Sequence, residues 1–143
     1  MALNFVVKTV PHKDQRYNTV GDYYHKDGVD HLIVTEDQDP VYEMAVALHE
    51  LAEWSWARDH SVTDADIDAF DTMFEEEIKA GKHPEDAEPG DDPRCPVYAG
   101  HQMASALERT FIAAMGRDWQ TYNKSLMDQV IARMKDEDGN AHS

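Results

Sequence analysis

The chain has 143 residues, of which 41% are apolar and 29% charged, and its net charge of −16 comes from 29 acidic and 13 basic residues. This length predicts a single domain that can bury a core without disulfide or metal staples. The acidic balance repels phosphate groups and therefore argues against binding to nucleic acid or to an anionic membrane surface. Two interpretations of the charge are open: a well-solvated acidic surface, or an acidic protein that occupies the basic groove of a partner.

Neither a membrane span nor a secretory signal is evident. The sequence contains no run of the roughly eighteen apolar residues that would span a bilayer. Its first residues, MALNFVVKTVPHKD, lack the basic lead-in and long apolar core of a signal peptide. The single cysteine, Cys95, cannot form an internal disulfide and suits a reducing compartment. We therefore expect a cytoplasmic protein without a membrane anchor.

The first 35 residues carry β-strand patterns. Residues 3–9 are rich in β-formers, and two β-prone runs at 22–25 and 31–35 flank a turn that contains glycine. The pair of runs predicts a hairpin. Together these segments predict a small antiparallel sheet of about three strands.

A helix is predicted from Asp39 and Pro40, an N-cap followed by a proline in the first helical position, to about residue 58. Its expected apolar stripe is Val41, Met44, Ala45, Leu48, Ala52 and Ser55. A second helix is predicted after Thr63, which forms a capping box with Asp66.

The remaining chain predicts an irregular segment and two more helices. Residues 80–96 are rich in proline, glycine and acids, and so long an irregular segment is usually functional or mobile. Helices are predicted at about 98–115 and after Asp118. We expect residues 1–135 to form one α+β domain and residues 136–143 to be a disordered tail.

The first predicted helix contains the segment HELAE, with His49, Glu50 and Glu53. His49 and Glu53 are four residues apart, so they lie on the same side of a helix. In HExxH enzymes a glutamate directly after the first histidine acts as general base on a metal-bound water. Glu50 has that position here.

The third predicted helix brings His101 and Glu108 to the centre of its apolar face. A buried glutamate is costly unless it is paired or bound to a cation. His49, Glu53 and His101 would supply the two imidazoles and one carboxylate of a catalytic zinc site. Glu108 would be a fourth ligand or would orient His101. Iron or manganese would accept the same ligands, and a metal-free polar network is the alternative.

Two further segments carry candidate substrate-binding residues. The stretch PHKDQRY offers Arg16, a bidentate donor for a carboxylate or phosphate, and Tyr17. The stretch GDDPRCPVYAGH offers Asp92, which could orient a ligand histidine, and Tyr98, which could stabilise an oxyanion. For each segment a structural role in a loop or cap is the alternative.

The pieces PHKDQRYNTVGDYY, ALHELAEW, DDPRCPVYAGH and ERTF resemble a group of small uncharacterised phage and bacterial proteins. The order of elements also resembles a minimal zincin, the two-layer metallopeptidase-like fold in which a sheet precedes the active-site helix. That resemblance implies His49 as first ligand, Glu50 as base, and a ligand from a later helix, here His101. Glu53 replaces the second histidine, so the motif is altered while the ligand types are kept.

The sequence leaves several functions open. A zinc-dependent hydrolase acting on a peptide or small molecule is favoured, with the strand HLIVTE able to hold an extended peptide by edge pairing. The pairs Glu50/Glu53 and Asp68/Asp71 also resemble the spacing in MazG-like pyrophosphohydrolases, which implies a magnesium site acting on nucleotides. A non-enzymatic acidic phage protein that binds a host factor, with a structural metal or none, is the third hypothesis.

Overall fold

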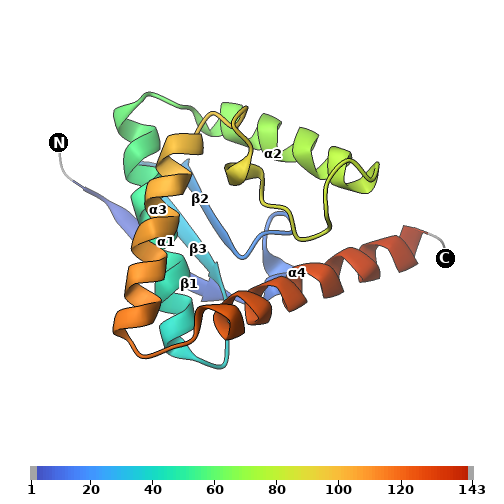
Figure 1. Ribbon diagram of the computed structural model, residues 1–143. Helices are drawn as coiled ribbons and strands as arrows, with labels where there is room; N and C mark the ends of the chain where they lie inside the picture. The colour runs from blue at the N-terminus through green and yellow to red at the C-terminus, as the bar shows by residue number, and fades with distance from the viewer. Residues whose placement is uncertain (1–2, 142–143) are drawn as a thin grey trace.

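A computed structural model describes residues 3–141 of the chain. Three strands are followed by four helices, which confirms the predicted α+β class (Figure 1). The elements are β1 (Phe5–Val10), β2 (Gly21–Lys26), β3 (Val29–Thr35), α1 (Pro40–Asp59), α2 (Asp64–Lys79), α3 (Tyr98–Ala114) and α4 (Trp119–Ala141), with short 3₁₀ turns η1 (His12–Asp14) and η2 (Pro89–Asp91).

The sheet is mixed, with the order β1-β3-β2. β2 and β3 form the predicted antiparallel hairpin, but β1 pairs with β3 in parallel, so the prediction of a wholly antiparallel sheet was wrong. The reason is the path of the chain. Residues 11–20 lead from β1 to the opposite edge, and β3 then returns between the two earlier strands in the direction of β1.

The β2–β3 hairpin closes through a two-residue turn of Asp27 and Gly28. Their φ angles are 53° and 79°, in the left-handed region, and Lys26 pairs with Val29 across the turn. An Asp-Gly pair is favoured in such a turn because both central residues need a positive φ.

The helix starts predicted at Asp39 and Thr63 are confirmed. The Asp39 side chain accepts a hydrogen bond from the Val41 amide at 3.0 Å, and Pro40 opens α1. Thr63 and Asp66 form a reciprocal capping box at the start of α2. These caps satisfy amides that have no partner inside the helix.

α1 lies between the sheet and α3, and this position determines which of its residues are buried (Figure 1). The expected stripe was wrong in its centre: Met44 is 57% exposed and Leu48 is only half-buried. The buried residues of α1 are Ala45, Val46, His49, Glu50, Glu53, Trp54 and Ala57. The interior face of α1 therefore includes all three polar residues of HELAE, none of which belongs to the expected apolar stripe.

Two apolar clusters form the core, and the polar residues of α1 lie between them along the helix. One cluster consists of Tyr23, Leu32, Trp54, Ala57, Cys95 and Val97. The other consists of Val34, Ala45, Val46, Ile112, Tyr122 and Leu126. A polar site is thus enclosed by two packed layers, which fix the backbone on both sides of it.

The C-terminal helix α4 runs to Ala141, and its distal part extends away from α1 and α3 (Figure 1). Residues 136–141 of the expected disordered tail therefore continue this helix, and residues 142–143 lie outside the described part of the chain. None of the helices between residues 3 and 141 has the length and apolar character of a membrane span.

Candidate metal centre

His49, Glu53 and His101 bring three ligand atoms together in the interior. Nε2 of His49 lies 3.1 Å from Oε2 of Glu53 and 3.1 Å from Nδ1 of His101. The remaining side of this triangle, from His101 Nδ1 to Glu53 Oε2, is 3.0 Å. α1 supplies two of the residues and α3 the third, and all three side chains are buried.

The triangle has the dimensions of one face of a tetrahedral metal site. Ligand atoms at about 2.05 Å from a tetrahedral zinc lie about 3.3 Å from one another, close to the distances found here. Hydrogen bonds alone satisfy the triangle less well, because two N–H groups donating to Oε2 of Glu53 leave the two nitrogens 3.1 Å apart without a bond between them. A cation at the centre would contact all three atoms.

The other nitrogen of His49 is held by a carboxylate. Nδ1 lies 2.7 Å from Oε1 of Glu108, and the hydroxyl of Tyr122 donates to the second oxygen of Glu108. Since a carboxylate accepts, this contact places a proton on Nδ1 and leaves Nε2 as the ring nitrogen that faces the triangle. Carboxylate partners orient metal-binding histidines in the same way.

His101 is oriented from the other side of the site. Its Nε2 lies 3.2 Å from Oε2 of Glu88 and 3.3 Å from Oδ1 of Asp91. Between these two acids, Gly90 lies so close to the imidazole that a Cβ there would overlap the ring. The η2 turn thus fixes the ring position and leaves Nδ1 for the triangle.

Glu53 has one oxygen engaged and one available. The hydroxyl of Tyr23 on β2 donates to Oε1 at 2.9 Å, while Oε2 is the oxygen within the triangle. This division suits a carboxylate that binds a metal through a single oxygen. Each of the three candidate ligands is therefore oriented by a group outside the triangle.

The protonation equilibria reflect an interior with excess negative charge. Burial lowers the pKa of His49, but the hydrogen bonds of Glu108 and Glu53 outweigh burial and raise it to about 11. Burial is likewise outweighed at His101, where Glu53 and Glu88 raise the pKa to about 10. For Glu53 the two imidazoles overcome burial and lower the pKa to about 2. Positive charge is favoured at this position, whether carried by protons or by a metal ion.

Glu50 lines a cavity of about 430 Å³ together with the three candidate ligands. It is 9% exposed and forms no hydrogen bond or ion pair with the described residues. Burial, followed by the negative charge of Glu53, raises its pKa well above the ordinary value. Gly21 makes room for it, since a Cβ there would overlap the Glu50 carboxyl group. These properties suit a group that accepts and returns a proton.

The structure separates Glu108 from the ligand atoms. Glu108 was predicted as a fourth ligand or as the partner of His101, but its oxygens contact His49 and Tyr122. Three candidate ligands remain, and a fourth position on a tetrahedral ion would be free for water, which is the pattern of catalytic rather than structural zinc.

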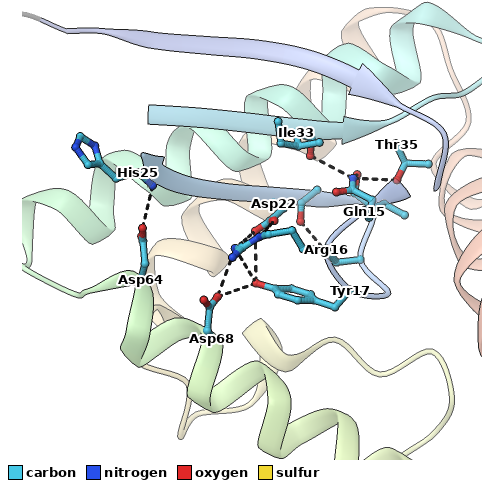
Figure 2. Close-up of polar contacts among 12 residues, drawn as sticks. Gln15, Arg16, Tyr17, Asp22, His25, Ile33, Thr35, Asp64 and Asp68 are labelled. Carbon is cyan, nitrogen blue, oxygen red and sulfur yellow. Dashed lines mark hydrogen bonds and ion pairs between the residues drawn. The ribbon is translucent and has the colours of Figure 1, made fainter. Parts of the chain in front are cut away.

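Arg16 and Tyr17 are committed to structural contacts (Figure 2). Arg16 forms a bidentate ion pair with Asp22, at 2.7 Å from Nε and 3.0 Å from Nη2. The Tyr17 hydroxyl donates to Asp68 at 2.9 Å and so ties the loop after β1 to α2. Tyr17 lines the cavity, whereas the charge of Arg16 is already balanced by Asp22. Arg16 therefore does not offer the free anion-binding group that its sequence position predicted.

Asp92 and Tyr98 are not brought to the cavity. Asp92 accepts hydrogen bonds from the amide and guanidinium of Arg94, and its place beside His101 is taken by Asp91. Tyr98 is 37% exposed at the start of α3 and is not among the residues that line the cavity. Asp91 and Asp92 are neighbours in an irregular loop, where no regular helix or strand spacing predicts which of the two faces His101.

Three residues that help to orient the candidate ligands were not predicted from the sequence. Tyr23, Glu88 and Tyr122 belong to β2, the irregular segment and α4, each far in sequence from the residue it contacts. The composition of residues 80–96 indicated a functional segment but not which of its acids would be used. Tyr122 is fully buried on α4, and a buried hydroxyl group needs a hydrogen-bond partner.

Magnesium coordination by carboxylates alone has less support. Glu50, Glu53 and Asp71 all line the cavity, but Asp68 is bonded to Tyr17. Among the described residues, the groups of three whose ligand atoms lie within 4.8 Å of one another are His49/Glu53/His101 and Glu88/Asp91/His101. Both contain an imidazole, a ligand that suits zinc or iron better than magnesium.

No protein-family model matches this chain, and the comparisons with curated proteins and with solved structures gave no match either. The inference of function therefore rests on the geometry of the site.

Proposed function

We propose that the protein is a metal-dependent hydrolase, with zinc as the metal and His49, Glu53 and His101 as its ligands. The closed triangle of ligand atoms at 3.0–3.1 Å carries the proposal. The partners outside the triangle support it, because Glu108, Glu88 and Tyr23 leave one donor atom of each ligand facing the same point. The buried free cysteine Cys95 accords with a cytoplasmic location as part of the proposal.

Zinc bound by three protein ligands lowers the pKa of a fourth, water ligand to about 7. Glu50 would take up a proton in the same cavity, for which its unpartnered carboxyl group and raised pKa are suited. Tyr23 and Glu108 would hold Glu53 and His49 in position during the reaction. The open cavity of about 430 Å³ would admit a small molecule or the end of a peptide.

A peptide would not pair with β3 as the sequence suggested, because β3 is the central strand and both of its edges are occupied. β2 is the edge strand on the side of the cavity, and its residues Gly21, Asp22 and Tyr23 line the wall. Edge pairing of an extended substrate would therefore involve β2.

Metal content tests the proposal. The purified, untagged protein is incubated with zinc, dialysed and analysed for metal beside His101→Ala and His25→Ala. His25 is a matched control, since it contacts Asp30 on the hairpin and does not line the cavity. One equivalent of zinc in the wild type and in His25→Ala, with none in His101→Ala, is the expected result. A wild-type protein without zinc would reduce the triangle to a polar network and favour the acidic partner-binding hypothesis.

A further inference from the structure

The cavity beside the candidate metal centre has far more carboxylates than it has basic partners. Its acidic lining residues include Asp22, Glu50, Glu53, Asp71, Glu88 and Glu108. Arg109 is the one arginine or lysine in the lining, and its guanidinium lies over the Trp119 ring at 4.2 Å. The two positive charges of a divalent ion bound by two neutral histidines would not balance the negative charge of these acids when they are ionised.

Among these six acids, Asp71 and Glu50 have no hydrogen-bond or ion-pair partner in the described part of the chain. Asp71, on α2, is half-buried, and burial together with the charges of Glu53 and Asp22 raises its pKa to about 7. Glu50, on α1, is 9% exposed and faces the same cavity. Asp22, Glu53, Glu88 and Glu108, in contrast, are bonded to Arg16, Tyr23 or the histidines. A carboxyl group that lines a cavity without a protein partner can accept a hydrogen bond from a ligand in that cavity.

The missing partner is best supplied by a group that carries a single positive charge and donates hydrogen bonds. Neither Asp71 nor Glu50 belongs to a close group of three metal-ligating atoms, so a second divalent ion is not favoured there. Anionic groups such as phosphates and peptide carboxylates would be repelled by the lining. An ammonium group would meet both the charge and the hydrogen-bonding capacity of Asp71.

We propose that the cavity binds its substrate through a protonated amine held by Asp71. This inference rests on the proposed function, because it names the substrate class of the same site. Glu50 lies in the same cavity and keeps its proposed role as general base. The amine has two possible sources, the α-amine of a peptide or a lysine-type side chain, and both present the same ammonium chemistry.

The test measures the binding of four small probes to the zinc-loaded full chain. Binding is monitored by NMR chemical-shift titration at neutral pH. The probes are L-leucinamide for an α-ammonium, N-acetyl-L-lysinamide for a side-chain ammonium, N-acetyl-L-leucinamide as neutral analogue and N-acetyl-L-leucine as anionic analogue. Asp71→Asn is compared with Glu76→Gln, an exposed acid on the same helix that forms no ion pair among the described residues.

We expect at least one ammonium probe to bind about tenfold more tightly than the neutral and anionic probes, as one charge-assisted hydrogen bond allows. Asp71→Asn removes this preference and Glu76→Gln keeps it. The tighter of the two ammonium probes identifies the source of the amine. Equal binding of charged and neutral probes, no binding of any probe, or an unchanged preference in Asp71→Asn overturns the inference.

Zinc content is measured on the same samples, so the two proposals fail separately. If the protein holds zinc but shows no preference for the ammonium probes, the proposed hydrolase site stands and the proposed amine substrate is contradicted. For a protein that holds no zinc, the titration is carried out on the metal-free chain, where the ammonium preference is judged by the same criteria.

Discussion

Nε2 of His49 and Nδ1 of His101 lie 3.1 Å apart, although 52 residues separate the two histidines in the chain. Each histidine presents a different ring nitrogen, and in each ring the opposite nitrogen contacts a carboxylate, Glu108 or Glu88. This arrangement directs one ring nitrogen from each of two helices toward Glu53.

Glu108→Gln is expected to weaken zinc binding about 10–100-fold without abolishing it, because the carboxylate that orients His49 is lost while the three ligands remain. Competition with a chelator of known affinity measures the change, with Glu76→Gln as control. Complete loss of zinc, equal to that in His49→Ala, would instead make Glu108 a direct ligand.

Glu50→Gln is expected to keep one equivalent of zinc and to lose hydrolysis of whichever peptide or amide the wild type cleaves. A general base contributes about 10²–10⁴-fold to rate, and the amide cannot accept the proton. Zinc analysis and steady-state rates on the same sample separate the two effects. Zinc lost from Glu50→Gln would place Glu50 among the ligands and contradict its assignment as base.

Gly90→Ala is expected to displace His101, because the added Cβ would overlap the imidazole ring. Zinc affinity should fall by at least about tenfold, since one ligand leaves its position. Gly139→Ala on α4 is the matched control: no atom lies within 4 Å of its Cβ position, and alanine favours a helix. Equal zinc affinity in the two variants would mean that the η2 turn does not position His101.

Zinc affinity is expected to rise between about pH 6 and pH 8, in contrast to a site whose histidines are already neutral. The pKa values of His49 and His101 are raised to about 11 and about 10, so both rings hold an extra proton at neutral pH in the metal-free protein. A metal must displace these protons, and each proton released increases affinity about tenfold per pH unit below the pKa. Calorimetry in buffers of different ionisation enthalpy counts the protons, and a pH-independent affinity would contradict this account.

The sequence predicted the parts of the fold that depend on local chemistry. The caps at Asp39 and Thr63 and the Asp27–Gly28 turn follow from side chains acting on their own backbone, and all three are confirmed in position or type. The pairing of β1 with β3 was not predictable, because two strands connected by residues 11–28 can pair in either direction until the connecting segment is placed.

The same contrast holds at the candidate metal centre. Helical spacing was sufficient to bring His49 and Glu53 together, and the central position of His101 on its helix predicted its burial. The contact of Glu108 with His49, and the contact of His101 with Asp91 in place of Asp92, depend on how two helices and a loop pack. The spacing of residues along the sequence does not predict this packing. Sequence patterns thus predicted the candidate ligands better than the groups that orient them.

The most direct measurement is X-ray absorption spectroscopy at the zinc edge of the zinc-loaded, dialysed protein. We expect a four-coordinate ion with two imidazole ligands and two oxygen ligands, at about 2.0–2.1 Å, and no sulfur ligand. Loss of zinc on dialysis, a single imidazole, or a sulfur ligand from Cys95 would contradict the assignment of His49, Glu53 and His101 as the metal centre.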